Sequence, residues 1–219
     1  MTGGIKHREG ELAVSAENPS LPNGFSVVGP GRVAAVVTYL EMRAQPNPRS
    51  GAGPRPEFML EPLDRRDIAA YRDLFRRIGE PWLWCSRLVL SDAQLQEALA
   101  DPMIEAHRLC QGSEAIGLLE LDFRTEGECE LLYFGLVNEA IGKGAGRYLM
   151  DLAIERAWAR PISRFFLHTC SFDHPRAVDF YRASGFRPYR LAVEVFEDPR
   201  LKGHLPRSAA PHVPIIEAL

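Results

Sequence analysis

The feature that most constrains this chain is a run of alternating glycines between a strand-like and a helical segment. Gly142, Gly144 and Gly146 follow the apolar segment Cys129–Val137 and lead into a helix predicted over Ala145–Trp158. At such a junction the backbone N–H groups point outward at the positive end of the helix dipole, and glycine leaves room for a ligand beside them. The sequence therefore predicts an anion site at the start of this helix.

Two common phosphate-binding motifs do not fit this loop. A Walker A loop requires a lysine followed by serine or threonine, but Lys143 is followed by Gly144. A dinucleotide fingerprint requires a parallel strand–helix–strand unit, whereas the strands before this loop are joined by short turns and are expected to be antiparallel. A glycine run alone is also compatible with a structural turn, so the surrounding elements must decide its meaning.

These elements predict one α/β core domain over about residues 57–200. Apolar spacings of three and four predict a helix at Asp64–Gly79, and a capping box formed by Ser91 and Gln94 predicts another at Asp92–Ala100. An antiparallel meander of three strands follows, at Ala106–Cys110, Ala115–Phe123 and Cys129–Val137. Beyond the glycine loop and its helix, the order is strand, helix, strand, at Arg164–Cys170, Pro175–Ser184 and Tyr189–Phe196.

Two segments lie outside this core. In the N-terminal extension, residues 1–56, Arg32–Met42 is rich in β-branched residues and predicts an added strand. Four prolines and two glycines in residues 43–56 favour a solvated linker, although its three arginines could contact a phosphate. Because the added strand is apolar on both faces, we expect it to join an exposed sheet edge, in its own chain rather than in a second copy. In the tail, residues 201–219, Val213–Ile216 suggests one more short strand.

Composition argues against several functional classes. The formal net charge is −3, without the clustered Lys and Arg that nucleic-acid binding requires. No apolar run reaches the roughly 18 residues of a membrane helix, and the first 24 residues lack a secretory signal, so we expect a cytoplasmic protein without a membrane partner. The six histidines lack metal-ligand spacing. Buried free thiols are expected at all four cysteines, Cys85, Cys110, Cys129 and Cys170.

The order of elements, with two motifs, resembles the GCN5-related N-acetyltransferase (GNAT) family over about residues 57–200. The family's pyrophosphate loop is written R/Q-x-x-G-x-G/A, and Ile141–Gly146 fits it except that Ile141 replaces Arg or Gln. A later family pattern, N-x-x-A-x-x-x-Y-x-x-x-G-F, has His174 at its first position, followed in register by Ala177, Tyr181, Gly185 and Phe186. The resemblance implies a mostly antiparallel mixed sheet flanked by helices, here with an extra N-terminal strand, and acetyl-CoA as acyl donor without a metal.

The resemblance also implies direct attack of an amine on a thioester, assisted by a base and an acid. Glu130, eleven residues before Ile141, occupies the position of the catalytic glutamate in protein-lysine acetyltransferases of this family and is the candidate base, directly or through water. Its alternative role is a solvated strand carboxylate; Glu120 is the second candidate, and Glu128 is expected at the exposed strand start. Tyr181 is the candidate acid for the thiolate of coenzyme A, or else a core tyrosine.

In this family the cofactor lies along the strand before the loop and on the loop itself. Gly135 in that strand is expected to let the pantetheine arm approach closely. The implied cofactor-binding residues are Leu136, Val137, Ile141, Gly142, Lys143, Gly144, Ala145, Gly146, Arg147 and His174.

The acceptor site is implied between the first two helices and the central strands. There Trp82 and Trp84 suit a cationic or aromatic amine and Arg87 suits a carboxylate, although such residues also pack between helices. Glu120 completes this set. His168 could face the acceptor, but a satisfied core histidine is the preferred interpretation. The expected reaction is acetylation of a primary amine of a small molecule. The alternatives are a protein N-terminal or lysine acetyltransferase and a non-catalytic acyl-CoA-binding module; both monomer and homodimer remain open.

Overall fold

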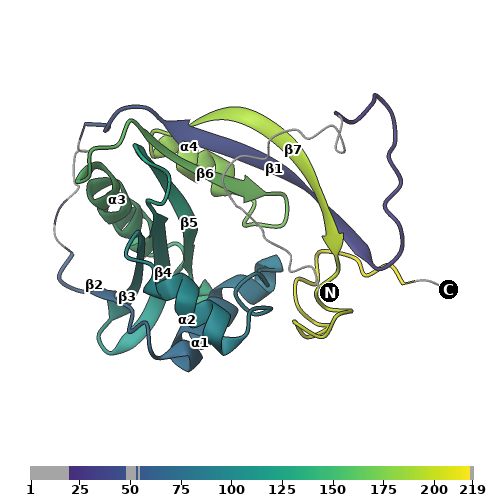
Figure 1. Ribbon diagram of the computed structural model, residues 1–219, viewed down its shortest axis with the longest axis horizontal. Helices are drawn as coiled ribbons and strands as arrows, with labels where there is room; N and C mark the ends of the chain where they lie inside the picture. Colours follow the sequence, from purple (N-terminus) through teal and green to yellow (C-terminus); the bar gives the residue numbers. More distant parts are fainter. Residues whose placement is uncertain (1–19, 48–52, 54, 218–219) are drawn as a thin grey trace.

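The computed structural model describes residues 20–47, 53 and 55–217 and is built on one seven-stranded sheet (Figure 1). Residues 1–19 and much of the linker therefore lie outside the described part of the chain. The strand order is β2-β3-β4-β5-β6-β1-β7, and only β5 and β6 are parallel neighbours. The strands are β1 Arg32–Met42, β2 Met59–Pro62, β3 Ile104–Gln111, β4 Glu114–Asp122, β5 Glu128–Leu136, β6 Arg164–Cys170 and β7 Arg187–Glu197.

Four α-helices flank the sheet, as the sequence predicts. They are α1 Ile68–Gly79, α2 Asp92–Ala100, α3 Ala145–Trp158 and α4 Ala177–Ala183. In Figure 1, α1 and α2 lie together, away from α3 and α4. The helix α2 begins at a complete capping box, in which Ser91 and Gln94 each bond the other's backbone N–H. Within the described ranges, no helix has the length and apolar character needed to cross a membrane.

The N-terminal strand β1 lies inside the sheet. It pairs antiparallel with β6 on one side and with β7 on the other, so that Val37 faces both Cys170 and Ala192. The prediction of docking within the chain is confirmed, but the predicted edge position is wrong, because β7 takes the edge and β1 satisfies two rows of backbone groups. β1 buries Val33, Ala35 and Val37 on one face and Leu40 on the other, each with at most 5% exposure.

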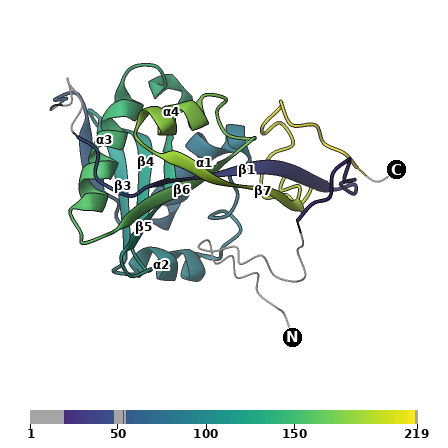
Figure 2. The same cartoon turned by 90° about the horizontal axis from the view of Figure 1, so that it is seen from above.

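The C-terminal segment is a compact loop organised by a buried arginine. The predicted strand at Val213–Ile216 is wrong, since these residues form no strand. Instead, the Arg200 guanidinium pairs with Asp198 at 2.7 Å and donates to the carbonyls of Ala209, Ala210 and Val213 at 3.2, 3.3 and 2.8 Å. Five fixed N–H donors let one arginine satisfy a loop that has no strand partner. Figure 2 shows this segment at the far end of β1 and β7.

Candidate active site

Between β5 and β6 the sheet opens into a wedge. These parallel strands pair only where Glu128–Glu130 faces Arg164–Phe166, although β5 continues to Leu136 and β6 to Cys170. The opening has a local cause in β5, whose register against β4 shifts at Leu132, an extra residue that bends the strand. Residues 132–136 of β5 are half-exposed along the opening. Beyond Glu130, whose partner is Phe166, the backbone groups of β5 on this side are therefore not paired with β6.

The glycine loop lies at the end of β5 that borders the wedge. Gly142 and Gly144 have φ angles of 82° and 88°, in the left-handed region that favours glycine. Gly144 is the N-cap residue of the fourteen-residue helix α3, so the first N–H groups of α3 follow directly after it. A Cβ at Gly146 would lie 3.5 Å from the Leu136 side chain, which packs the start of α3 against the end of β5.

The other predicted cofactor residues differ in what they can offer a ligand. Lys143 and Arg147 are exposed side chains beside the loop, and Arg147 also lies over the Phe180 ring at 5.7 Å. Val137 and Ala145 are buried, so only their backbone groups can contact a ligand. Ile141 is half-buried.

An arginine from the linker lies over this loop. A Cβ built on Gly144 would be 3.7 Å from Nη2 of Arg55, whose side chain is 49% exposed and forms a 3.4 Å ion pair with Glu57. The chain is anchored there because the Phe58 N–H bonds the Arg55 carbonyl and the Phe58 ring packs against Tyr148 of α3. The end of the linker is thus part of the loop's surroundings, a placement that the proline-rich sequence did not reveal.

Glu130 lies where the wedge begins, beside a histidine. It pairs with Asp122, and the alternation along β4 puts Asp122 on the same face as Glu120, which contacts α1. The Glu130 side chain is 6% exposed, and its Oε1 is 3.5 Å from Nδ1 of His168 on β6. His168 is 34% exposed and lies 5.7 Å from the Tyr39 ring of β1. The prediction of a core histidine is therefore wrong, and the solvated alternative for Glu130 does not fit its burial.

Glu120 has a different environment. It is fully buried; Arg87 Nη2 lies 2.8 Å from its Oε2, and the Tyr71 hydroxyl donates to its Oε1. Burial lowers the pKa of Arg87, but the Glu120 carboxylate outweighs it and holds the pKa above its ordinary value. Burial, with the Glu120 charge second, raises the pKa of Tyr71. The charges of Arg87 and Glu120 are thus matched inside the protein.

Trp84 packs between α1 and the sheet. A Cβ at Gly79 would lie 2.4 Å from Trp84 Cβ, and one at Gly135 would lie 2.4 Å from Ile78 Cγ2 and 3.1 Å from the Trp84 ring. Gly135 therefore admits α1 and Trp84, so the expected close approach to pantetheine is not the reason for this glycine. The Trp84 indole N–H donates to Asp173 at 3.0 Å, which ties this packing to the chain after β6.

Trp82 lies against two histidines. Its ring is 5.6 Å from His174, at the first position of the second family motif, and 6.0 Å from His212 in the C-terminal loop. His174 also accepts a bond from the Arg176 N–H through Nδ1. A hollow of about 310 Å³ borders His174 and is lined by residues of β1, β6 and the start of α4. Trp82 is thus the one predicted tryptophan that joins the motif region to the C-terminal loop.

Tyr181 is 9% exposed on α4. Its ring lies 6.2 Å from Phe134 of the wedge strand and 6.1 Å from Phe186. Burial, with a smaller contribution from the Asp173 carboxylate, raises the pKa of Tyr181. The phenol therefore remains protonated at neutral pH and retains a proton that it can donate.

The family is decided by a match across this region. A sequence model described as the acetyltransferase (GNAT) family matches residues 68–186, more than half of the chain. The chain belongs to the GNAT family. The matched span contains the wedge, the glycine loop, Glu130 and Tyr181, whereas β1 and Arg55 precede it. GNAT enzymes transfer an acetyl group, and the family uses acetyl-CoA as its donor.

Similar proteins support this membership. A mycothiol acetyltransferase from Jonesia denitrificans is 27% identical over 139 residues, which are 63% of this chain; the chain spans about two-fifths (39%) of that protein. A GNAT-family structure from Novosphingobium aromaticivorans has a TM-score of 0.54 at 16% identity, covering 78% of this chain and 69% of that one. One from Sphaerobacter thermophilus has a TM-score of 0.57 at 12% identity, covering 87% and 55%. These two structures share the GNAT fold with the chain.

If the Arg87 guanidinium neutralises the buried Glu120 carboxylate, replacing Arg87 will reduce the stability of the fold. Arg87→Met leaves the Glu120 carboxylate buried without its cation, so the free energy of unfolding should fall by about 3–5 kcal/mol. Arg87→Met combined with Glu120→Gln should recover much of this loss, since the amide still accepts from Tyr71. Urea unfolding of the three proteins measures both effects. Unchanged stability in Arg87→Met would show instead that the guanidinium is available to an acceptor.

Proposed function

We propose that this GNAT enzyme transfers an acetyl group from acetyl-CoA directly to a primary amine of a small molecule. The observation that carries the proposal is the wedge between β5 and β6, which runs from Glu130 to the glycine loop at the start of α3. From Leu136 to Glu130 the strand spans six residues, or roughly 20 Å at about 3.3 Å per residue. An extended ligand with phosphates at one end and a reactive group at the other matches this arrangement.

Phosphate binding is assigned to the loop and its cationic neighbours. The N–H groups beside Gly142, Gly144 and Gly146 and the start of α3 are suited to hold a pyrophosphate. Lys143 and Arg147 add positive charge, and Arg55 adds a third cation from outside the matched family span. When bound, acetyl-CoA supplies an activated thioester; Leu136, Val137, Ile141, Ala145 and His174 are the remaining residues assigned to holding it.

Glu130 is the proposed base, acting through His168. An alkyl ammonium must lose a proton before it can attack, and the 6%-exposed Glu130 side chain is less accessible than the 34%-exposed His168. An imidazole that takes the proton at Nε2 gains a favourable partner in the Glu130 carboxylate beside Nδ1. Glu120, in contrast, is committed to Arg87 and Tyr71.

Tyr181 is the proposed acid for the departing thiolate. Its ring contacts Phe134 of the wedge strand, and like an ordinary tyrosine it is protonated at neutral pH and so has a proton to donate. Direct transfer is favoured over an acyl-cysteine intermediate, because burial raises the pKa of all four thiols, to about 11 at Cys85 and Cys170, and so disfavours a thiolate.

The acceptor is proposed to be a small molecule. The relative named mycothiol acetyltransferase supports this class, over the 63% of this chain that it matches. Of the predicted acceptor residues, Trp82 has two histidines as ring neighbours and is the best placed to contact an acceptor, while Trp84, Arg87 and Glu120 also hold the fold together. An acetyl-CoA-dependent thiol-release screen over small amines, amino acids and peptides tests the substrate class; turnover of peptides alone would contradict it.

A side chain at Gly144 should prevent cofactor binding. Gly144→Val introduces a branched residue at a φ of 88° and places it among the N–H groups proposed to hold phosphate, so calorimetry should detect no acetyl-CoA binding. Gly112→Val is the matched control, because Gly112 also has a positive φ, 61°, with open space around it. Wild-type affinity in a folded Gly144→Val protein would refute the phosphate assignment.

Loss of Arg55 should weaken acetyl-CoA binding without abolishing it. A half-exposed cation beside phosphate contributes about 1.4 kcal/mol, so Arg55→Ala should raise Kd about tenfold. Arg43→Ala is the control, since Arg43 is ion-paired to Glu41 and 61% exposed. Equal Kd values for the two variants would remove Arg55 from the cofactor site.

Glu130→Gln should lower kcat by roughly 10²–10⁴-fold, with little change in acetyl-CoA affinity, and higher pH should restore part of the rate by deprotonating the amine in solution. Glu128→Gln, two residues away and paired with Arg164 at 3.3 Å, should keep the wild-type rate. Steady-state kinetics across pH provide the measurement. A Glu130→Gln profile identical to wild type would transfer the role of base to another group.

Tyr181→Phe should lower kcat by roughly 10²-fold, because a thiolate with a pKa near 8.5 can still leave unaided. An acetyl thioester of an aromatic thiol, whose leaving group needs no proton, should restore most of the rate. The melting temperature should remain near that of wild type, because the ring contacts are kept. A defect that is equal with both donors would mean that the hydroxyl only positions neighbouring groups.

A further inference from the structure

The outer edge of the sheet is formed by a long strand. β7 pairs with β1 over nearly its whole length, and among the described residues no strand pairs with its other side. The Val36 N–H and C=O both bond Ser171 on the β6 side, so the groups of Val37 point to β7 and those of its partner Ala192 point back. By alternation, Leu191, Val193 and Val195 direct their N–H and C=O groups away from the sheet.

The side chains along this edge are apolar and exposed. Leu191, Val193 and Val195 are 69%, 46% and 48% exposed, and Val36, opposite Val193 on β1, is 50% exposed. Monomeric proteins usually protect an edge with lysine, proline or a bulge. At its start β7 has Pro188 next to a register shift; from Leu191 to Glu197 it has no lysine, proline or bulge, and the charged residues there are Glu194 and Glu197.

The β7 sequence is also complementary to itself in the reverse direction. About Ala192, Leu191 mirrors Val193 and Arg190 mirrors Glu194. The outer positions continue the pattern, with Tyr189 mirroring Val195, Pro188 mirroring Phe196, and Arg187 mirroring Glu197. Antiparallel pairing of two copies about Ala192 would therefore place apolar residues opposite apolar ones and each arginine opposite a glutamate, an arrangement that stabilises cross-strand pairs.

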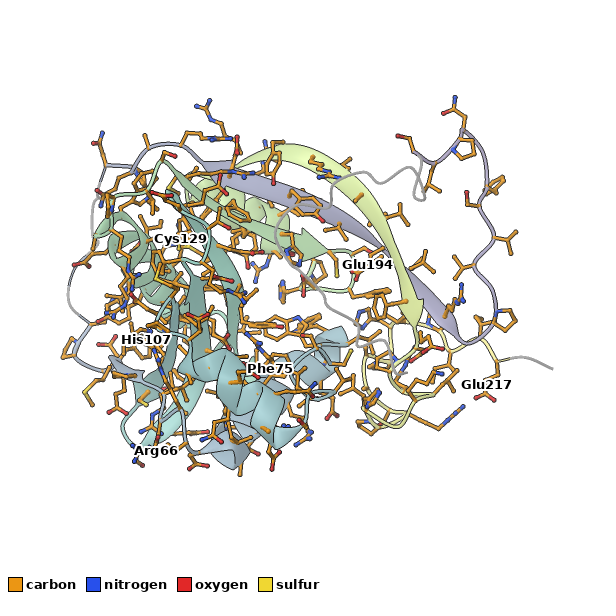
Figure 3. The ribbon with its side chains drawn as sticks, viewed as in Figure 1. Arg66, Phe75, His107, Cys129, Glu194 and Glu217 are labelled. Atoms are coloured by element: carbon orange, nitrogen blue, oxygen red, sulfur yellow. The ribbon has the colours of Figure 1, made fainter. Side chains whose placement is uncertain are left out.

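We propose that two copies of this chain dimerise by antiparallel pairing of their β7 strands, with the two-fold axis at Ala192. The two sheets then form one continuous sheet, and Arg190 of each copy faces Glu194 of the other. These charges lie on the inner face of the ribbon, where Figure 3 shows Glu194 and where Arg190 lies 5.4 Å from the Tyr39 ring centre. Tyr39 also contacts His168, which lies beside Glu130. Two side chains, Tyr39 and His168, therefore separate Arg190 at the interface from the proposed base.

The pairing is tested by the mass of the full chain in solution. Sedimentation over a concentration series should give twice the 24.5 kDa chain mass for the wild type. Val193→Lys puts a charge at the centre of the edge and should give single chains with unchanged circular dichroism. A wild-type protein that remains a single chain at every concentration would overturn the proposal, and so would a dimer that Val193→Lys leaves intact.

Charge exchange tests the register. Arg190→Glu alone places acidic side chains opposite one another, and Glu194→Arg alone places basic ones opposite, so each variant should be a single chain. Mixed together, the two variants should form a one-to-one dimer, because every opposing pair then has opposite charges. A mixture that stays monomeric, or single variants that still dimerise, would contradict pairing about Ala192. None of these measurements depends on acetyl transfer.

Discussion

The short parallel contact between β5 and β6 is the constraint on which the rest of the site depends. β5 and β6 pair over three residues and then separate, so each strand needs another partner to hold it in place, and each has one. The extra residue at Leu132 bends β5 while Gly135 lets Ile78 of α1 pack against it. On the other side, β1 pairs with β6, and Trp84 bonds Asp173 beyond its end. Packing on either side of the opening therefore holds the two strands apart, and no ligand is needed to do so.

The two buried glutamates show how environment separates residues of one type on one face. Glu120 is neutralised by Arg87 and bonded by Tyr71, which matches its charge in the core. Glu130 has a histidine that reaches solvent, so a proton can enter or leave beside it. The carboxylate beside a partly exposed histidine is the one suited to proton transfer, because that histidine can exchange a proton with solvent.

The sequence predicts what is local in this protein. The glycine loop, the α2 capping box and the order of strands follow from turn chemistry and apolar period. The position of β1 does not, because alternation identifies a strand but not its neighbours. The surroundings of His168 and Arg55 could not be predicted for a related reason: each gains them from residues far away in the chain, Glu130 and Gly144. The C-terminal loop depends on one arginine whose five donors replace a strand ladder.

The insertion of β1 between β6 and β7 sets an order for folding during synthesis. Val37 leaves the ribosome first, but its partner Ala192 follows 155 residues later. Its other partner, Cys170 of β6, follows 133 residues after it, so until β6 is made the apolar strand has no place in the sheet, and contacts this distant in sequence form slowly. The nascent chain must therefore keep β1 from pairing elsewhere while the family core assembles. Chaperone demand and misfolding during expression should consequently depend on the first strand to be made, although the sheet is completed by the last.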